Sequence, residues 1–448
     1  MRATFWIALL LAAGPLGAAD AADAWQAVAY PYTGRIFDMT IEGGTLWMST
    51  QGDGLVGYDG MTWMAHRASA GGIRLDNWNY TVFVDAAGDK WVARDGSETV
   101  DRLNDGGTLA DTSDDVWTYY SHPTELVNFR VFSMAEDAHG TKWFGMRDED
   151  HYLPGIVECL VDNDPSTTAD DEWYHFDNAW SPDSTRFSDD DVRALAVDQA
   201  GRLWIGYYAT GVDVWGYGNL DTFADDTWAH YAVGTGLPSA LVHTLHVGPD
   251  GRVWAGTLGG LAVYSPSTGS WTTVSGLPGT QVRAIAADAQ GHIWVGTDAG
   301  VAMLYGSGAV GLTFGTGDGL PYGTVQALAV EQSTGRVWAL TSDPSTQATA
   351  IAYYDSGFGP QAGLVYVYPN PWKAAEATGP MNVFGVPDGS SVDVYDITGQ
   401  RVRELDRSEP YAWDTLDRRG YEVPSGVYVV RVETPSGDRF FVKAAIVR

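Results

Sequence analysis

The sequence predicts an all-β protein, in which a seven-bladed β-propeller precedes a small β-sandwich. Three observations carry this prediction. A phrase made of a glycine-bearing turn, an apolar residue or lysine, and a tryptophan occurs seven times, short strands fill each unit, and the phrase stops after Gly363. A repeat every 40 to 60 residues, roughly, indicates a repeat architecture in which one unit explains the others.

One repeating unit can be read from Asp190 to Trp228, and it contains four short strands, at about 192–197, 202–207, 211–217 and 228–231. Four strands with glycine-bearing turns and no helical period are typical of a propeller blade. The phrase tryptophan falls in the second strand, where a large ring can fill the space between blades. We therefore expect a scaffold role for Trp47, Trp91, Trp143, Trp204, Trp254, Trp294 and Trp338.

The last repeat lacks a fourth strand, because it stops after residues 351–354. Residues 24–30 (AWQAVAY) resemble the fourth strand at 227–232 (TWAHYA), and each of the two stretches precedes a first strand. We therefore expect the residues near Trp25 to complete the last blade, so that both ends of the repeat region close the ring.

The first 22 residues have the pattern of a secretory signal peptide, with Arg2, an apolar run at 5–13 and small residues at 16–22. The apolar run is too short to span a bilayer, and no later run is long enough. The predicted divisions are a signal peptide at 1–22, the propeller at 23–361 and the sandwich at 362–448. We expect a bacterial protein, secreted or on the outer cell surface, without a transmembrane anchor.

The chain has a net charge of −31, which argues against binding to nucleic acid or to anionic membranes. Its only cysteine, Cys159, cannot form an internal disulfide and is expected to be a small buried residue. Acidic residues cluster at 111–115, 162–172, 189–191 and 221–226. A solvated surface explains these clusters, and calcium binding is the alternative. No other cofactor is expected, and we expect a monomer.

The phrases at 288–301 (DAQGHIWVGTDAGV) and 250–261 (DGRVWAGTLGGL) resemble the repeats of the two-component regulator propeller family. The resemblance covers about residues 25–360 and is looser in the first three units and in the seventh, where Leu340 replaces a glycine. Such propellers often form the periplasmic sensor of a hybrid histidine kinase. No kinase or regulator segment is present here, so the resemblance implies a ligand-binding use more than direct signal transduction.

The sequence after Gly363 consists of alternating strands and turns, which suggest a β-sandwich. The Tyr-Pro-Asn-Pro opening at 368–371, VYDITGQRV at 394–402 and a closing lysine-bearing strand resemble C-terminal sorting domains of the type IX secretion system. Trp413-Asp414, Gly420 and residues 423–428 resemble the Ig-like domain of flagellar hook-capping proteins. The first resemblance implies an export address that is cleaved or attached at the cell surface, and the second implies a β-sandwich appendage.

A ligand site is predicted at one mouth of the central channel, where the first strand of each unit begins. The residues at that position are Phe37, Tyr80, Phe132, Arg193, His243, Arg283 and Gln326, and Arg94, Met146, Tyr207 and Asp298 follow the second strands. Aromatic faces with arginine forks suit a sugar ring or a carboxylate. The alternative is that these side chains only fill the channel entrance.

Sequence motifs give little support for catalysis, because GxSxG, phosphate-loop and HExxH patterns are missing. His243 and His246 share a short strand without an obvious third ligand, so no metal site is predicted. Propeller lyases that cleave streptogramin antibiotics have similar blades, and His243 keeps such a lyase as an enzyme alternative. Paired carboxylates are too abundant here for their spacing to discriminate.

The leading prediction is therefore a non-catalytic propeller that recognises an extracellular glycan, peptide or protein, with a C-terminal domain that the export machinery reads. The competing class is a structural platform that binds proteins through blade rims and acidic loops and takes no small ligand. The sequence does not identify the ligand.

Overall fold

The fold is given by a computed structural model, which describes residues 24–67, 78–95, 99–121, 130–147, 157–162, 168, 170–176, 187–222, 224–306, 308–356, 366–368, 372–374, 380–384, 386, 390–405, 411–433 and 439–448. The predicted signal peptide at 1–22 lies outside these residues. Within them the protein is all-β, as predicted, with a single 3₁₀ turn at η2 (Thr316–Asp318) and no α-helix.

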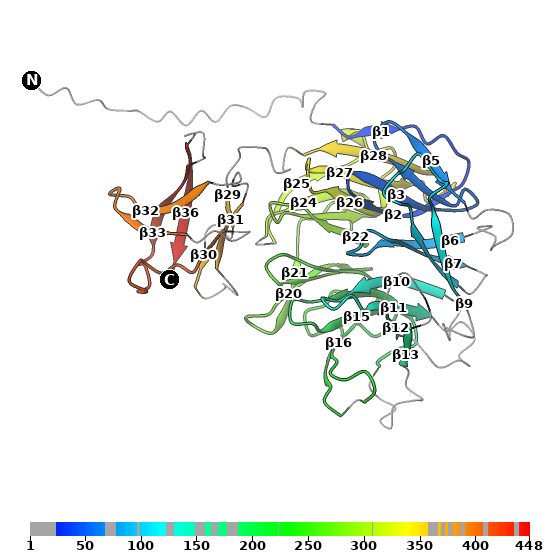
Figure 1. The fold of residues 1–448 in the computed structure, drawn as a ribbon, viewed down its shortest axis with the longest axis horizontal. Helices are drawn as coiled ribbons and strands as arrows, with labels where there is room; N and C mark the ends of the chain where they lie inside the picture. The colour runs from blue at the N-terminus through cyan, green and yellow to red at the C-terminus, as the bar shows by residue number, and fades with distance from the viewer. Residues whose placement is uncertain are drawn as a thin grey trace, which may run out of the picture.

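Seven antiparallel sheets of four strands each form the larger part of the chain (Figure 1). Blade 1 consists of β2–β5, blade 2 of β6–β9, blade 3 of β10–β13, blade 4 of β14–β17, blade 5 of β18–β21 and blade 6 of β22–β25, while β26–β28 and β1 form blade 7. The first strands of successive blades contact one another in a closed ring, from β2 through β26 and back to β2. The fold is therefore a β-propeller whose first strands line the channel.

The strands are short and follow the predicted order within each blade. The first strands are β2 (Ile36–Glu42), β6 (Trp78–Val84), β10 (Arg130–Glu136), β14 (Val192–Val197), β18 (Val242–Val247), β22 (Val282–Ala287) and β26 (Thr324–Glu331). The second strands are β3 (Thr45–Thr50), β7 (Lys90–Asp95), β11 (Lys142–Arg147), β15 (Leu203–Tyr207), β19 (Val253–Thr257), β23 (Ile293–Thr297) and β27 (Arg336–Ser342).

The third and fourth strands lie further from the channel. The third strands are β4 (Leu55–Tyr58), β8 (Thr99–Asn104), β12 (Val157–Val161), β16 (Val212–Gly216), β20 (Gly260–Ser265), β24 (Gly300–Leu304) and β28 (Thr349–Asp355). The fourth strands are β5 (Trp63–His66), β9 (Val116–Ser121), β13 (Glu172–Phe176), β17 (Thr227–Tyr231), β21 (Ser270–Val274), β25 (Val310–Phe314) and β1 (Gln26–Val28).

The N-terminal strand β1 closes the ring, as the sequence predicts. It pairs antiparallel with β28, with Gln26 opposite Tyr353 and Val28 opposite Ile351, and Figure 1 shows the blue β1 beside the yellow β28. Trp25 is 4% exposed and packs against Phe314 of blade 6 and Tyr354 of blade 7. The N-terminal segment therefore completes blade 7 and, through Trp25, packs blade 7 against blade 6.

The repeated phrase is scaffold, because each phrase tryptophan is buried. In blades 2, 4 and 6 the aspartate six residues before the tryptophan accepts its indole N–H, as Asp198 does from Trp204 at 2.8 Å. The other oxygen of Asp198 accepts backbone N–H groups of the turn, whose Gly201 has a φ of 76°. The carboxylate thus ties the turn to the ring, and glycine supplies the left-handed backbone.

The glycine two residues after the tryptophan makes room for the next blade. A Cβ atom on Gly206 would lie 2.7 Å from Cγ1 of Val242, and one on Gly256 would lie 2.6 Å from Cγ1 of Val282. In blade 7 this position is Leu340, which packs with Ile36 of blade 1. The glycine therefore sets how closely the valine of the next first strand can approach.

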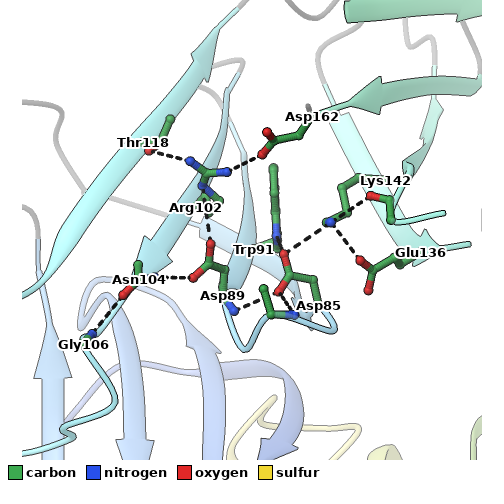
Figure 2. Close-up of polar contacts among 12 residues, drawn as sticks. Asp85, Asp89, Trp91, Arg102, Asn104, Gly106, Thr118, Glu136, Lys142 and Asp162 are labelled. Atoms are coloured by element: carbon green, nitrogen blue, oxygen red, sulfur yellow. Dashed lines mark hydrogen bonds and ion pairs between the residues drawn. The ribbon is translucent and has the colours of Figure 1, made fainter. Parts of the chain in front are cut away.

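Buried ion pairs join blades 1, 2 and 3, and Figure 2 shows those between blades 2 and 3. Arg102 on β8 binds Asp162 of blade 3 at 2.7 Å, and Lys142 on β11 lies 3.5 Å from Asp85 of blade 2. Lys90 on β7 binds Asp105 at 2.8 Å and reaches Glu42 of blade 1 at 3.4 Å. The lysines that replace an apolar residue before the tryptophan therefore serve as contacts between blades.

The C-terminal part consists of two sheets around a common core. One sheet contains β29 (Tyr366–Tyr368), β31 (Met381–Phe384) and β34 (Tyr411–Trp413), and the other contains β30 (Trp372–Lys373), β32 (Ser391–Asp396), β33 (Arg401–Glu404), β35 (Gly426–Glu433) and β36 (Arg439–Val447). Met381 and Val383 of the first sheet pack with Val394 and Val430 of the second, and Trp413 is fully buried among them. The predicted β-sandwich is therefore present, and its Ig-like assignment stays a prediction.

Candidate functional site

The seven predicted mouth residues share one backbone feature, a β-bulge in the first strand of every blade. The register shifts between Val192 and Ala194, which leaves Arg193 without a partner on the second strand. The same shift occurs at Phe37, Tyr80, Phe132, His243, Arg283 and Gln326. Because a bulge changes the direction of a side chain, it is a common device beside binding sites.

The bulge follows from the residue pattern at the start of each strand. In blade 4, Val192 and Ala194 are buried with Leu195, and Arg193 between them is half-buried. In a regular strand, every second side chain points to the same face. Burial of the first, third and fourth residues, Val192, Ala194 and Leu195, breaks this alternation. Phe37, Phe132, His243, Arg283 and Gln326 are likewise half-buried. The side chain of Tyr80 lies outside the described part.

Arg193 is held by two kinds of neighbour. Its Nη2 donates to Asp191 Oδ2 at 2.8 Å, and its Cζ lies 4.3 Å from the ring centroid of Phe132 and 5.1 Å from that of Tyr208. Asp191 lies 3.4 Å from the Nε of Arg147 as well. The arginine is thus fixed between an aromatic ring of blade 3 and a carboxylate of its own blade.

Arg283 has a different environment. Its Nη2 donates to the neutral Oε1 of Gln281 at 2.8 Å, while its Nε is buried without a hydrogen-bond partner. Gln281 is held in turn, because its backbone N–H donates to Asp298 Oδ1 at 3.0 Å. Gln281 is a neutral partner and therefore brings no negative charge to this guanidinium.

His243 lies between these two arginines in the order of the blades. Burial, together with the charges of Arg283 and Arg193, lowers its pKa to about 4. The imidazole is therefore neutral at physiological pH, and its buried Nε2 has no partner among the described residues. Gln326 donates to Ser342 Oγ at 2.7 Å.

The two mouths of the channel differ. His246, near the other end of β18, lines a cavity of about 380 Å³ with Val247, Gln290 and Gln332, and burial lowers its pKa to about 4. The two histidines of β18 therefore lie at opposite ends of the strand. Among the described residues, no group of three or more His, Cys, Asp or Glu side chains is arranged to hold a metal ion.

Two of the residues predicted beside the mouth are instead part of the core. Met146 is fully buried among residues of blades 2 and 3, and Tyr207 is fully buried with its hydroxyl donating to Asp213 at 2.9 Å. They pair with residues 131 and 192, which point between blades, so the strand period places them away from the channel. The side chain of Arg94 lies outside the described part.

A serine, a histidine and an aspartate meet in blade 4, which sequence reasoning did not predict. Ser188 Oγ lies 2.8 Å from Asp213 Oδ1 and 2.9 Å from His230 Nδ1, and the same Nδ1 lies 2.6 Å from Asp213 Oδ1. In a catalytic triad the serine and the acid use opposite ring nitrogens. Here both use Nδ1, so the group ties a loop to the sheet and is not a nucleophile relay.

Several of the acidic residues considered for calcium have protein partners. Asp162 binds Arg102, Asp191 binds Arg193, and Asp226 accepts from Trp215 Nε1 at 2.7 Å. Asp111 accepts from Ser113. These contacts account for the carboxylates by loop and blade structure, and calcium binding stays an untested expectation.

Comparison with known proteins agrees with the propeller. A family model described as two component regulator propeller matches residues 186–209 and 276–299, which hold the first two strands of blades 4 and 6. No curated protein matches the sequence significantly. Among the described residues, no helix is long and apolar enough to cross a membrane.

Several solved structures share the fold. PorZ, a surface component of the type-IX secretion system of Porphyromonas gingivalis, has a TM-score of 0.57 and 20% identity over 94% of this chain and 61% of its own. The extracellular domain of a protein described as a hybrid two component system of B. thetaiotaomicron has a TM-score of 0.57 and 15% identity over 95% and 58%. A streptogramin B lyase has a TM-score of 0.51 and 14% identity over 73% and 96%.

The chain thus spans about three fifths of the length of the first two structures. At these identities the likeness establishes the fold, which is a β-propeller. What those proteins do bears on this chain only as a guide to proposals.

Proposed function

We propose that this chain is an exported, non-catalytic propeller that binds an extracellular ligand at the mouth formed by its bulge residues. The observation that carries the proposal is the bulge itself, which recurs at the same position in all seven first strands. Packing alone has no need for the polar, half-buried residues that occupy this position in blades 4 to 7.

The residues at this mouth suit a ligand with an apolar face and polar groups. Phe37 and Phe132 supply aromatic surface, while Arg193, His243, Arg283 and Gln326 follow one another in blades 4 to 7. Aromatic faces and guanidinium groups together bind glycans or peptides. A glycan is the leading ligand class.

Export and sorting belong to the same proposal. Residues 1–22 would direct export, the propeller would occupy 23–361, and the sandwich at 362–448 would be read by the export machinery as a sorting domain. The type-IX description of PorZ and its similarity over most of this chain support the sorting assignment by analogy. We propose a monomer at, or released from, the bacterial surface.

The experiment is an array of extracellular glycans and peptides probed with the full mature chain and with an Arg193→Ala, Arg283→Ala double variant. Binding by the wild type, lost in a double variant of unchanged melting temperature, supports the proposal. No hit in any class, or hits that survive the double substitution, would favour a protein-binding platform that uses the blade rims.

Mass spectrometry of the exported protein tests sorting separately. Loss of residues 1–22 together with cleavage or attachment near residue 361 is expected. An intact C-terminus without surface attachment would make the sandwich a plain appendage.

The lyase alternative is tested by incubating the chain with a streptogramin and measuring ring opening. The streptogramin lyase shares the fold. A neutral His243 has the protonation state of a general base, but burial and the charges of Arg283 and Arg193 disfavour the imidazolium that a base would become. We expect no turnover.

A further inference from the structure

Arg283 lies at the mouth without a counter-charge among the described residues. Among the described residues its hydrogen-bond partner is the side-chain oxygen of Gln281, and no carboxylate lies within 4.0 Å of its nitrogens. The Nε is also buried without a partner. A partly desolvated guanidinium with an unused N–H is unfavourable unless an anion completes it.

Arg35 repeats this arrangement in blade 1. Its Cζ lies 5.1 Å from the ring centroid of Phe37, its Nε is buried without a partner, and no carboxylate pairs with it among the described residues. Arg193, in contrast, already has Asp191. Among the described residues the mouth therefore holds two cations, Arg35 and Arg283, without a carboxylate partner, in a chain whose net charge is −31.

His243 lies between the blades of Arg193 and Arg283, and its Nε2 is a neutral atom that can form a hydrogen bond. Burial is the largest cause of its lowered pKa, and the charges of Arg283 and Arg193 lower the pKa in the same direction. The titratable and charged groups that bear on it are Arg193 and Arg283, from the blades on either side. Its unpartnered Nε2 suits a hydroxyl group, which can donate or accept.

We propose that this mouth binds a carboxylate-bearing sugar, with Arg283 binding the carboxylate and His243 a ring hydroxyl. This inference rests on the proposed function and names the ligand of that site. A planar carboxylate matches the fork of a guanidinium in a bidentate contact. The neutral side chains of His243 and Gln326 can form hydrogen bonds with sugar hydroxyl groups. The acidic side chain of a peptide has no hydroxyl group to offer them.

The overall charge of the protein favours a short acidic ligand over a long polyanion. Charges farther away than about 8 Å are screened at physiological ionic strength, so the mouth acts on one or two sugar units at close range. A long anionic chain would meet the acidic surface beyond the mouth. The acidic end of a glycan therefore fits better than its middle.

The test is titration calorimetry of the full mature chain against matched oligosaccharides. The panel contains oligosaccharides ending in glucuronic or galacturonic acid, the same sugars with the carboxyl group reduced to an alcohol, sulfated sugars of the same length, and acidic peptides. We expect the uronate-ended sugars to bind, and reduction of the carboxyl group to lower affinity at least tenfold, as for loss of a charged hydrogen bond, about 1.5 kcal/mol or more.

Substitutions locate the contact. Arg283→Ala should remove at least tenfold of the affinity for the uronate-ended sugar and leave the affinity for the reduced sugar unchanged. His243→Gln should weaken both sugars alike. One control variant is Arg336→Ala, because Arg336 begins β27 and its side chain pairs with Asp355 at the end of β28. The other is His246→Gln, because His246 lies at the other end of β18 from His243.

The outcomes separate this inference from the proposed function. Equal binding of acidic and reduced sugars would overturn the carboxylate assignment while leaving a glycan-binding propeller. Preference for sulfated sugars or for acidic peptides would overturn the ligand class in the same way. If no member of the panel binds and the wider array gives no hit, both the carboxylate assignment and the proposed ligand-binding function are overturned.

Discussion

The guanidinium of Arg193 lies over the ring of Phe132, with its Cζ 4.3 Å from the ring centroid. Both are bulge residues, one in blade 4 and the other in blade 3. The contact crosses the boundary between blades at the channel mouth, and Asp191 fixes the arginine from the other side. The first prediction follows from this geometry.

Replacing Arg193 with lysine should weaken ligand binding about tenfold, although the charge is kept. Lysine cannot form the planar stack on Phe132 or the forked contact with Asp191. The measurement is the affinity for whichever glycan the array identifies. Arg202→Lys is the matched control in the same blade, because Arg202 also binds an aspartate, Asp198, and lies over Trp204 away from the mouth.

Removing residues 24–31 should lower the stability of the whole propeller. The deletion takes away β1 and the buried ring of Trp25, and Trp25→Ala alone should cost about 3–5 kcal/mol. Thermal unfolding followed by circular dichroism measures the effect against a chain that starts at residue 23. An unchanged melting temperature would contradict closure of the ring by β1.

Gly256→Ala should destabilise the protein by about 1–3 kcal/mol through overpacking. The new methyl group would lie 2.6 Å from Val282 Cγ1 and 2.6 Å from Thr244 Cγ2. Gly315→Ala is the control, since nothing lies within 4 Å of its Cβ position and its φ is −131°. Chemical denaturation of the two variants should therefore separate them clearly.

Arg102→Met should cost about 3–5 kcal/mol, because it leaves the buried carboxylates of Asp89 and Asp162 without their cation. Arg336→Met removes a more exposed pair with Asp355 and should cost about 0–1 kcal/mol. The free energy of unfolding from denaturant titration provides the comparison. Equal effects would mean that the network between blades 2 and 3 has no special role.

The propeller should lose stability as the pH falls from about 6.5 to about 4, in part through His243 and His246. Both have a pKa of about 4 in the folded chain and about 6.5 when unfolded, so the unfolded chain binds more protons within this window. The contribution is complete above pH 6.5 and is lost as the pH falls through the folded pKa.

Melting temperatures of wild type and of a His243→Gln, His246→Gln double variant, taken from pH 7.5 to 4.5, measure this term. The double variant should lose less stability across the range, because glutamine does not titrate. His139→Gln, at an exposed turn, should follow the wild type. Parallel curves for all three chains would show that the two imidazoles have the same pKa in the folded and the unfolded chain.

Local patterns made much of this fold predictable. The tryptophan phrase is repeated because every blade solves the same packing problem, and the missing fourth strand of blade 7 was visible as a resemblance between residues 24–30 and 227–232. The sequence also predicts where the first strands begin, and Arg193 and Arg283 both lie at the bulge there. Met146 and Tyr207 were misplaced, because which face of the second strand looks into the channel depends on pairing.

The sequence by itself determined the repeat, the closure of the ring by the residues near Trp25, and the seven positions at which blades differ. Only the tertiary structure decided that all seven are bulge residues, that Arg193 is neutralised by Asp191, and that Arg283 is not. A repeat is visible in the sequence because each blade except blade 7 is formed by consecutive residues. Charge compensation depends on side chains from different turns and blades, which only the folded chain brings together.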